Sequence, residues 1–272
     1  MSTLVVRRLL VDMEQPIARY WCDGDAFRSA FLNALSMSFP FGEQFFIDSV
    51  REGFKALPAD QQMRFESDVK GFVGQEATHR RLHGLYNEHL ERLGYVNGWE
   101  PRARERSTIL ENQDVRHWLA VTAAYEHFTA VLAEWFLAHP ETFGMRDERL
   151  RTLWLWHSAE ETEHRAVAFD LYRALGGNDA WRIKWFRQVT LLFLVNATRQ
   201  TIDNLRADGD LWRWSTLRSA ASTLFGRRGL IKGSLRRWRA YFRPGFHPHQ
   251  ADDTASREWL ARNGDRFTPV GG

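Results

Sequence analysis

Sulfur ligands are almost missing from this sequence. Among its 272 residues, Cys22 is the single cysteine. One cysteine cannot build an intrachain disulfide framework, a cysteine-based zinc site or an iron–sulfur site. Any metal that the chain holds must therefore be bound by His, Asp and Glu side chains.

Long apolar runs are scarce as well. The uncharged run at residues 188–198, QVTLLFLVNAT, is shorter than the roughly 20 apolar residues that span a bilayer. Near the N-terminus, Arg7 and Arg8 interrupt the apolar stretch and Asp12 follows closely, which is not typical of a secretory signal peptide. We therefore expect a cytoplasmic location.

Glycine and proline, which often end helices, are also few, with 19 and 8 residues. Most of the sequence between them repeats its apolar residues at helical spacing, and no stretch alternates like a strand. We therefore predict an all-α fold of long antiparallel helices. Gly94 is placed to end the second helix, and Gly71 and Gly74 within it would permit close contact with another helix. The expected helices are 41–55 after Pro40, 60–93, 107–138, 147–175 capped by Asp147, and 180–206, with 94–106 as a polar linker.

The first four of these helices each carry a glutamate, and two of them add a histidine three residues later. Along the chain the order is Glu, Glu-x-x-His, Glu, Glu-x-x-His, with similar spacing in both halves. Because residues i and i+3 share one face of a helix, each Glu-x-x-His pair offers an oxygen and a nitrogen to one side. The six residues are Glu43, Glu76, His79, Glu126, Glu161 and His164.

Four carboxylates and two imidazoles can hold two divalent ions inside a helix bundle, with two of the carboxylates bridging the ions. By ligand type, this set favours iron or manganese over copper. Without metal, four carboxylates buried together would repel one another and would be costly to desolvate. The alternative is a set of pairs on solvated helix faces, but aromatic neighbours such as Phe46, Phe72 and Trp156 favour an interior site.

This order and spacing resemble the ferritin-like di-iron carboxylate superfamily. The segments FPFGEQFF, QEATHRRLH, AYEHFTA and WHSAEETEHRAVAFD are similar to a bacterial family labelled "predicted metal-dependent hydrolase", over about residues 20–245. The resemblance implies a ferritin-like antiparallel four-helix bundle with additional C-terminal helices, and two metal ions bound by the six residues. Iron is the expected metal, with manganese as an alternative, and O₂ is the expected co-substrate if the chemistry is oxidative.

Two further histidines share helix faces with these motifs. His83 follows His79 by four residues, and His157 precedes Glu161 by four. Each can be an additional ligand, a hydrogen-bond partner of a ligand or a proton donor. The alternative for each is a buried histidine with a structural hydrogen bond.

Three other residues near the motifs have open roles. Tyr125 can hydrogen-bond an oxygen at the metals, although core packing is the simpler explanation. Glu160 and Glu163 flank the last motif. We expect solvated positions, with a bond from one of the two to a ligand histidine or to a neighbouring arginine as the alternative.

Charge divides the chain unevenly. The net charge is only +3, yet residues 1–181 hold 20 basic and 27 acidic residues, while residues 182–243 hold 14 basic and three acidic ones. We therefore expect a di-metal four-helix-bundle core with its N-terminal segment (1–181), a basic Trp/Arg-rich helical segment packed on or extending it (182–243), and a C-terminal tail (244–272).

The basic segment 182–243 interleaves Trp and Arg. Such a pattern is typical of peripheral contact with an anionic membrane, and equally of docking on an acidic body. The protein can then be cytoplasmic and membrane-associated at the surface. Nothing in the segment resembles a nucleic-acid-binding motif, so we do not expect nucleic acid as a partner.

Two metal ions in a helical bundle support more than one function. The superfamily favours an O₂-activating oxygenase or oxidase, and a content of 12 Trp and 19 Phe suits an apolar or lipid-like small-molecule substrate. The first alternative is a metal-dependent hydrolase, in which the ions lower the pKa of water and polarise a carbonyl or phosphoryl group. The second is a ferritin-like iron-binding protein. The sequence names no electron donor, and a homodimer is compatible with it.

Overall fold

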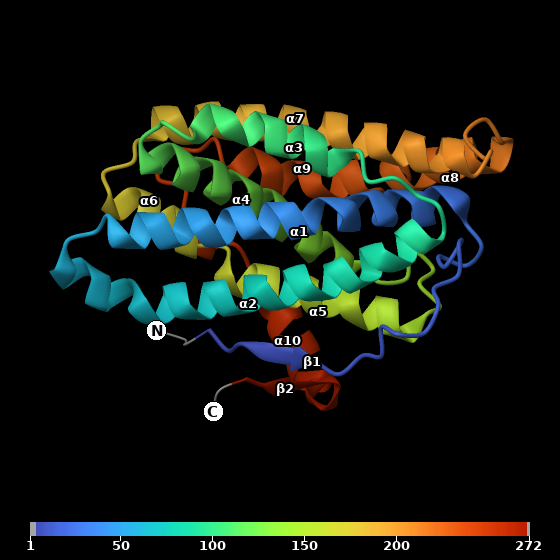
Figure 1. The fold of residues 1–272 in the computed structure, drawn as a ribbon, viewed down its shortest axis with the longest axis horizontal. Coiled ribbons are helices and arrows are strands. Elements are labelled where there is room, and N and C mark those ends of the chain that lie inside the picture. Colours follow the sequence, from blue (N-terminus) through green and yellow to red (C-terminus); the bar gives the residue numbers. More distant parts are fainter. Residues whose placement is uncertain (1–3, 271–272) are drawn as a thin grey trace.

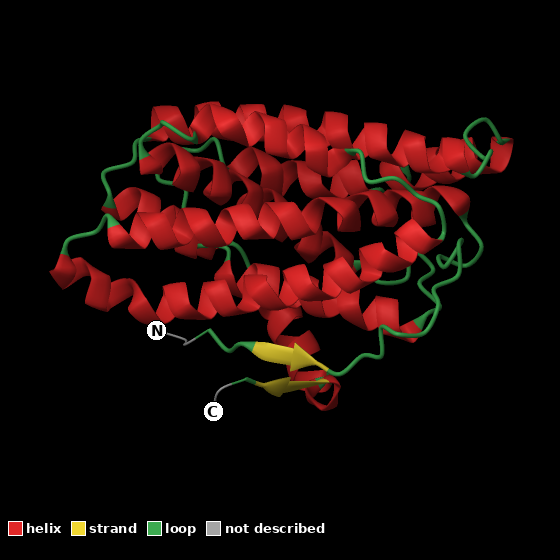
Figure 2. Cartoon of the chain, viewed as in Figure 1, coloured by secondary structure: helices red, strands yellow, loops and turns green. Residues whose placement is uncertain are grey.

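Helices make up most of the structure, a computed structural model that describes residues 4–270. Figure 2 shows them stacked side by side, with one pair of short strands at an edge. The predicted all-α class is confirmed. The helices are α1 (Ala26–Lys55), α2 (Ala59–Arg92), α3 (Trp99–Ser107), α4 (Val115–Ala138), α5 (Glu148–His164), α6 (Val167–Ala174), α7 (Asp179–Ala207), α8 (Trp214–Phe225), α9 (Leu230–Ala240) and α10 (Thr254–Arg262).

Four of these helices enclose a common interior. α1 packs along α2, α2 contacts α5, α5 packs along α4, and α4 contacts α1. α7 packs outside this ring against α1 and α4, and α9 packs against α4. In Figure 1, α7, α8 and α9 lie in the upper part of the molecule, and α2 and α5 lie below α1 and α4.

Helix α1 begins at Ala26, so the expected start after Pro40 is wrong. The side chain of Asp25 caps the helix by accepting a backbone N–H from its first turn. Pro40 lies inside the helix, where it offers no N–H to the carbonyl of Ser36. Nδ2 of Asn87, on α2, donates to that carbonyl at 3.1 Å. The neighbouring helix therefore satisfies the group that proline leaves free.

Residues 94–106 are not the expected polar linker, because most of them form α3. The side-chain oxygen of Asn97 accepts two backbone N–H groups at the start of that helix. Pro101 lies in the first turn, where a missing N–H breaks no helical bond. Helix α4 starts eight residues later than predicted, at Val115, and its cap is Asp114.

The predicted helix 147–175 is interrupted. Asp147 caps α5 as expected, but α5 ends at His164 and α6 follows after a two-residue break. In this break the buried side chain of Arg165 pairs with Glu134 of α4. No glycine or proline marks the interruption, so periodicity could not predict it. The predicted α7 and the role of Gly94, which has a φ of 88°, are confirmed.

A small sheet joins the two ends of the described chain, a feature that the sequence did not predict. β1 (Arg7–Leu9) pairs antiparallel with β2 (Phe267–Pro269). Three-residue strands are too short to give a periodic signal. Single turns of 3₁₀ helix complete the structure at Thr108–Leu110, Pro248–Gln250 and Gly264–Arg266.

The N-terminal segment crosses α2 at two glycines. A Cβ added at Gly71 would lie 2.4 Å from Leu4, and one added at Gly74 would lie 2.3 Å from Val6. The two glycines therefore make room for the N-terminal segment, and not for another helix as predicted. This close approach places β1 against the helices that carry the Glu-x-x-His motifs.

Candidate metal centre

The six residues predicted as metal ligands meet inside the ring of α1, α2, α4 and α5. α1 supplies Glu43, α2 supplies Glu76 and His79, α4 supplies Glu126, and α5 supplies Glu161 and His164. Each residue has at most 4% of its surface exposed. This burial excludes the alternative of solvated pairs on the surface.

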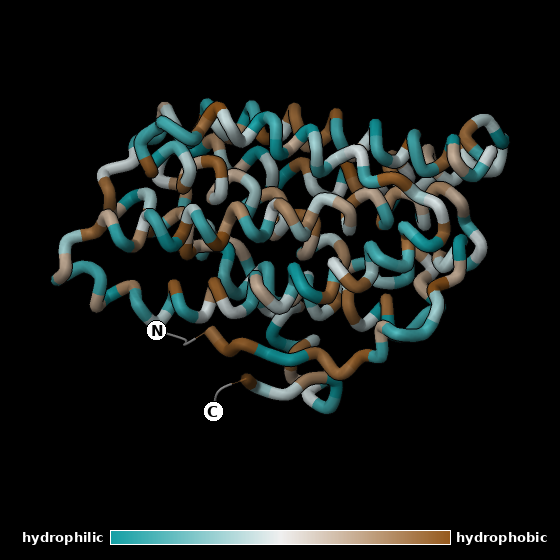
Figure 3. Tube along the Cα trace, viewed as in Figure 1, coloured by the Kyte–Doolittle hydropathy of each residue, from teal (hydrophilic) through white to brown (hydrophobic). Residues whose placement is uncertain are grey.

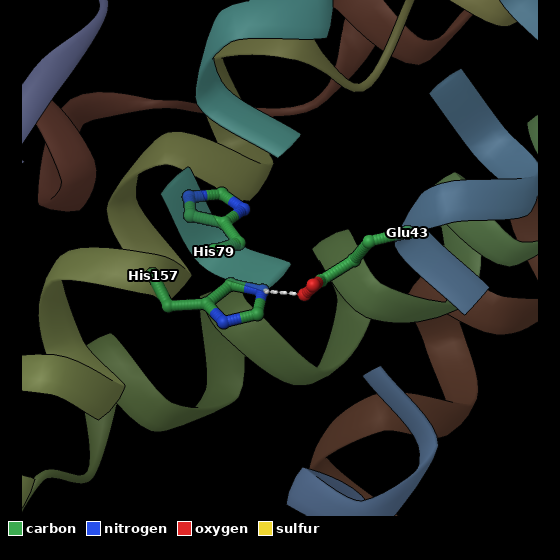
Figure 4. A group of neighbouring side chains, drawn as sticks. All are labelled: Glu43, His79 and His157. Carbon is green, nitrogen blue, oxygen red and sulfur yellow. Dashed lines mark ion pairs between the residues drawn. The ribbon is translucent and has the colours of Figure 1, made fainter. Parts of the chain in front are cut away.

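Donor atoms of these six residues and of His157 form three overlapping groups, and within each group the atoms lie within 4.8 Å of one another. Figure 4 shows the first group, in which Glu43 and His157 point toward each other beside His79. Neighbouring groups share His79 or Glu76, as expected for adjacent ions that share ligands. The groups are Glu43–His79–His157, Glu76–His79–Glu161 and Glu76–Glu126–His164.

Glu161 lies among the histidines of all three groups. Its Oε1 lies 2.9 Å from Nε2 of His157, 3.5 Å from Nδ1 of His79 and 3.6 Å from Nε2 of His164. One oxygen of this carboxylate therefore faces donor atoms from both halves of the motif pattern. That position suits a bridging ligand.

Many of these donor atoms have no hydrogen-bond partner within residues 4–270, although they are buried. They are both oxygens of Glu43, Glu76 and Glu126, Oε2 of Glu161, Nδ1 of His79 and Nε2 of His164. Nearly all buried polar atoms in proteins are hydrogen-bonded. Orphaned oxygens and nitrogens that share one interior fit bound cations, so these residues fit the metal pair that the sequence predicts.

The electrostatics of the cluster are those of a crowded, buried set of carboxylates. Burial raises the pKa of Glu126 to about 8. It also raises the pKa of Glu43 well above its ordinary value, and the nearby charge of Glu76 adds to this effect. Burial works in the same direction on Glu161, but the hydrogen bond from His157 and the close approach of His164 and His79 hold its pKa well below the ordinary value. Metal binding would displace the protons on the raised carboxyls.

The outward nitrogen of each motif histidine is held by a neighbouring side chain. Nε2 of His79 lies 3.0 Å from Oε2 of Glu160, and Nδ1 of His164 lies 2.9 Å from Oε1 of Gln75. The opposite nitrogens, Nδ1 of His79 and Nε2 of His164, therefore face the carboxylates. Such hydrogen bonds fix the tautomer and the orientation of a metal-binding imidazole.

Arg7 of β1 joins these holding residues to the N-terminal segment. Its guanidinium donates to Glu160 at 2.9 Å and to Glu163 at 2.6 and 3.0 Å. Glu163 also accepts a bond from Gln75 at 3.0 Å. The solvated position expected for Glu160 is wrong, because that residue is completely buried. The alternative is confirmed, with Glu160 bonded to a motif histidine and both glutamates bonded to an arginine.

Sequence reasoning missed Arg7 and Gln75 because their partners are distant in the chain. Arg7 lies 153 residues from Glu160, and Gln75 lies 89 residues from His164. Local spacing carries no information about such contacts. The sole signal was compositional: two adjacent arginines interrupt an otherwise apolar stretch.

His157 and His83 form a hydrogen-bonded chain that leads away from the cluster. Nδ1 of His157 lies 2.8 Å from Nε2 of His83, and Nδ1 of His83 lies 2.9 Å from Oγ of Ser36. Burial lowers the pKa of His157 to about 4 and that of His83 well below its ordinary value, so both rings are neutral. The structure therefore brings His157 to the donor atoms and keeps His83 one contact further away.

A cavity of about 140 Å³ adjoins the cluster, with Glu43 in its wall. Its lining comes from α1, α3, α4 and α7 and is mostly aromatic and aliphatic. Tyr125 lines this cavity, and burial raises the pKa of its hydroxyl to about 12. Tyr125 makes no side-chain hydrogen bond to the six clustered residues.

Fold and site together define a helical protein with a buried glutamate–histidine cluster that can hold metal ions. Comparison of the sequence with known families identifies the family of the chain. The family described as "Predicted metal-dependent hydrolase" matches residues 5–252, and the chain belongs to it, which confirms that part of the resemblance seen in the motifs. Comparisons with curated proteins and with solved structures find no match. The wider relation to the ferritin-like superfamily stays a prediction.

Among residues 4–270, no helix combines the length and the apolar character that crossing a membrane requires.

Proposed function

We propose that this protein is a metal-dependent hydrolase with two metal ions in the buried cluster. The observation that carries the proposal is the set of orphaned oxygens and nitrogens on four helices around one interior. The family description supports hydrolysis over the oxygenase that the motif order first favoured. The proposed ligands are Glu43, Glu76, His79, Glu126, Glu161 and His164.

Two divalent ions, when bound, supply Lewis acidity and a water nucleophile of lowered pKa. The protein's own residues exclude water and bind the substrate. The ring of helices keeps bulk water from the cluster, because its members are almost fully buried. Tyr125 is protonated at neutral pH, as an ordinary tyrosine is, and burial raises its pKa further, to about 12. Its hydroxyl can therefore donate a hydrogen bond to a substrate in the adjoining cavity.

His157 and His83 act as positioning residues in this proposal. Nε2 of His157 holds Glu161 through a 2.9 Å hydrogen bond, and His83 holds the other ring nitrogen of His157, Nδ1. Because both rings are neutral, they add no positive charge that would compete with metal for the carboxylates. We expect His83→Gln to weaken metal binding less than His157→Gln, because His83 does not touch a proposed ligand.

The test is hydrolysis by the metal-free full chain reloaded with Zn²⁺, Mn²⁺ or Fe²⁺ under anaerobic conditions. p-Nitrophenyl hexanoate, p-nitrophenyl phosphate and a p-nitroanilide serve as ester, phosphoester and amide probes. We expect metal-dependent release of the chromophore from at least one probe without O₂, and its loss in Glu76→Gln. Glu88→Gln is the matched control, because Glu88 lies exposed on the same helix. Absence of metal-dependent release from all three probes would overturn the proposal.

Oxidation with O₂ is the second candidate function. The observation that favours it is the donor set itself, four carboxylates and two imidazoles on four helices, which is the set found in di-iron carboxylate bundles. The same preparations distinguish the two functions. Consumption of O₂ that requires Fe²⁺, together with no hydrolysis by the Zn²⁺ or Mn²⁺ forms, would favour oxidation.

A further inference from the structure

The cavity beside Glu43 is apolar, with a single cationic side chain in its wall. Its apolar lining includes Phe41, Phe45, Trp99, Val121, Leu192 and Phe193. The charged residues that line it are Glu43, at the metal cluster, and Arg106, from α3. For scale, an engineered apolar cavity of about 150 Å³ holds a benzene molecule. The cavity therefore suits an apolar group of about six carbons.

Arg106 differs from the two other arginines of the same helix. Arg104 pairs with Glu100 at 2.8 Å, and Arg102 donates to the cavity-lining Asn196 at 3.2 Å. Arg106 is partly buried and makes no ion pair or side-chain hydrogen bond with any part of the described chain. An arginine in a cavity wall without a partner favours an anion, because its guanidinium donors suit carboxylate and phosphate oxygens.

We propose that this cavity binds a small anionic amphiphile, with the apolar group among the aromatic walls and the anionic group on Arg106. The inference rests on the proposed function, because it takes this molecule to be the substrate class of the adjoining metal cluster. The hydrolysable bond of the molecule would then lie at the Glu43 side of the cavity, beside the metal cluster, while Arg106 would select for an anion.

Binding to the metal-free full chain tests the inference without turnover. Isothermal titration calorimetry would compare hexanoate, hexyl phosphate, hexanamide and hexylamine. We expect hexanoate or hexyl phosphate to bind about tenfold more tightly than hexanamide, as a charge-assisted hydrogen bond predicts, and hexylamine to bind more weakly than either. The comparison of the two anions distinguishes a carboxylate from a phosphate ligand.

Variants assign the charge preference to Arg106 and the apolar contribution to the cavity. Arg106→Gln should remove the preference for the anion while retaining the binding of hexanamide. Arg199→Gln is the control for diffuse attraction by the basic segment, because Arg199 lies exposed on α7, and it should retain the preference. Val121→Phe on α4 and Ala103→Phe on α3 would each fill part of the cavity. Either variant, if folded, should bind all of the probes more weakly.

Equal binding of hexanoate, hexyl phosphate and hexanamide, or an anion preference that survives Arg106→Gln, would overturn the inference. Its failure can be separated from failure of the proposed function. Hydrolysis of p-nitrophenyl hexanoate without an anion preference would remove the inference alone. Anion-selective binding without metal-dependent hydrolysis would remove the hydrolase proposal and leave the binding site.

Discussion

The buried metal cluster and the basic segment 182–243 carry charge in opposite ways. In the cluster, four carboxylates share an interior in which no member is more than 4% exposed. In the basic segment, most arginines lie on the surface, with Arg182 as a buried exception, and Trp212 and Trp214 are 82% and 78% exposed. A buried charge must have a partner, whereas a solvated charge contributes little to stability. Substitutions should therefore have large effects in the cluster and small effects in the basic segment.

Figure 3 shows hydrophilic and hydrophobic positions interspersed along α7, at the upper edge of the molecule. Leu191, Leu194 and Val195 on this helix are each at least 48% exposed. An exposed mixture of apolar and basic residues is typical of a surface that meets a partner. The predicted contact of this segment with an anionic membrane stays a prediction.

The largest effect is expected from removing two central carboxylates with Glu76→Gln and Glu161→Gln. Each residue belongs to the overlapping groups of donor atoms, so the double variant should lose both ions. For the wild-type chain at a free metal concentration about 100 times Kd, bound metal should add about 2.7 kcal/mol of stability per site. Thermal unfolding with and without a chelator measures this difference. A double variant that still responds to the chelator like the wild type would contradict the assigned ligands.

A matched pair of glycine substitutions tests the support of the cluster by the N-terminal segment. Gly74→Ala should destabilise the protein by about 1–3 kcal/mol, because the new Cβ would lie 2.3 Å from Val6. Gly84→Ala, on the same helix, meets nothing within 4 Å and should stabilise by up to about 1 kcal/mol. Urea unfolding measures both. Equal effects of the two substitutions would show that the N-terminal segment is not held against α2.

A substitution of His127 tests the contact between the ring of helices and the basic segment. His127 lies on α4, and its Nε2 bonds the carbonyl of Arg237, in the basic segment, at 3.2 Å. Burial lowers its pKa to about 3. The unfolded chain, with a histidine pKa of about 6.5, binds the proton more readily below that pH. Stability should therefore fall between pH 6.5 and 3, by at most about 1.4 kcal/mol per pH unit from this residue. His127→Gln should flatten the acid limb of a stability–pH curve, and an unchanged slope would contradict this assignment.

The smallest effect on stability is expected from Trp212→Ser and Trp214→Ser in the basic segment. Because both indoles are largely exposed, the double variant should change the free energy of unfolding by no more than about 0.5 kcal/mol. Metal content should not change. Co-sedimentation with anionic vesicles should fall, with zwitterionic vesicles as the control. Wild-type binding to anionic vesicles that survives the substitutions would place the predicted membrane contact elsewhere.

The cluster was more predictable from sequence than the boundaries of the helices that carry it. The i, i+3 spacing of Glu76 with His79 and of Glu161 with His164 is local, so it identified the helix faces that meet. Pro40 does not end the preceding helix because the missing hydrogen bond is replaced by one from Asn87, which is 51 residues from Ser36 in the sequence. The role of β1 could not be predicted for the same reason, because Arg7 lies 153 residues from Glu160 in the sequence.

Metal content tests the proposed centre most directly. The full chain would be loaded with excess Fe²⁺ or Mn²⁺ at neutral pH under anaerobic conditions, desalted, and measured by elemental analysis. Two ions per chain in the wild type, and fewer than one in the Glu76→Gln, Glu161→Gln variant, are the expected results. Fewer than one ion per wild-type chain, or an equal content in the double variant, would contradict a metal pair held by the buried carboxylates and histidines.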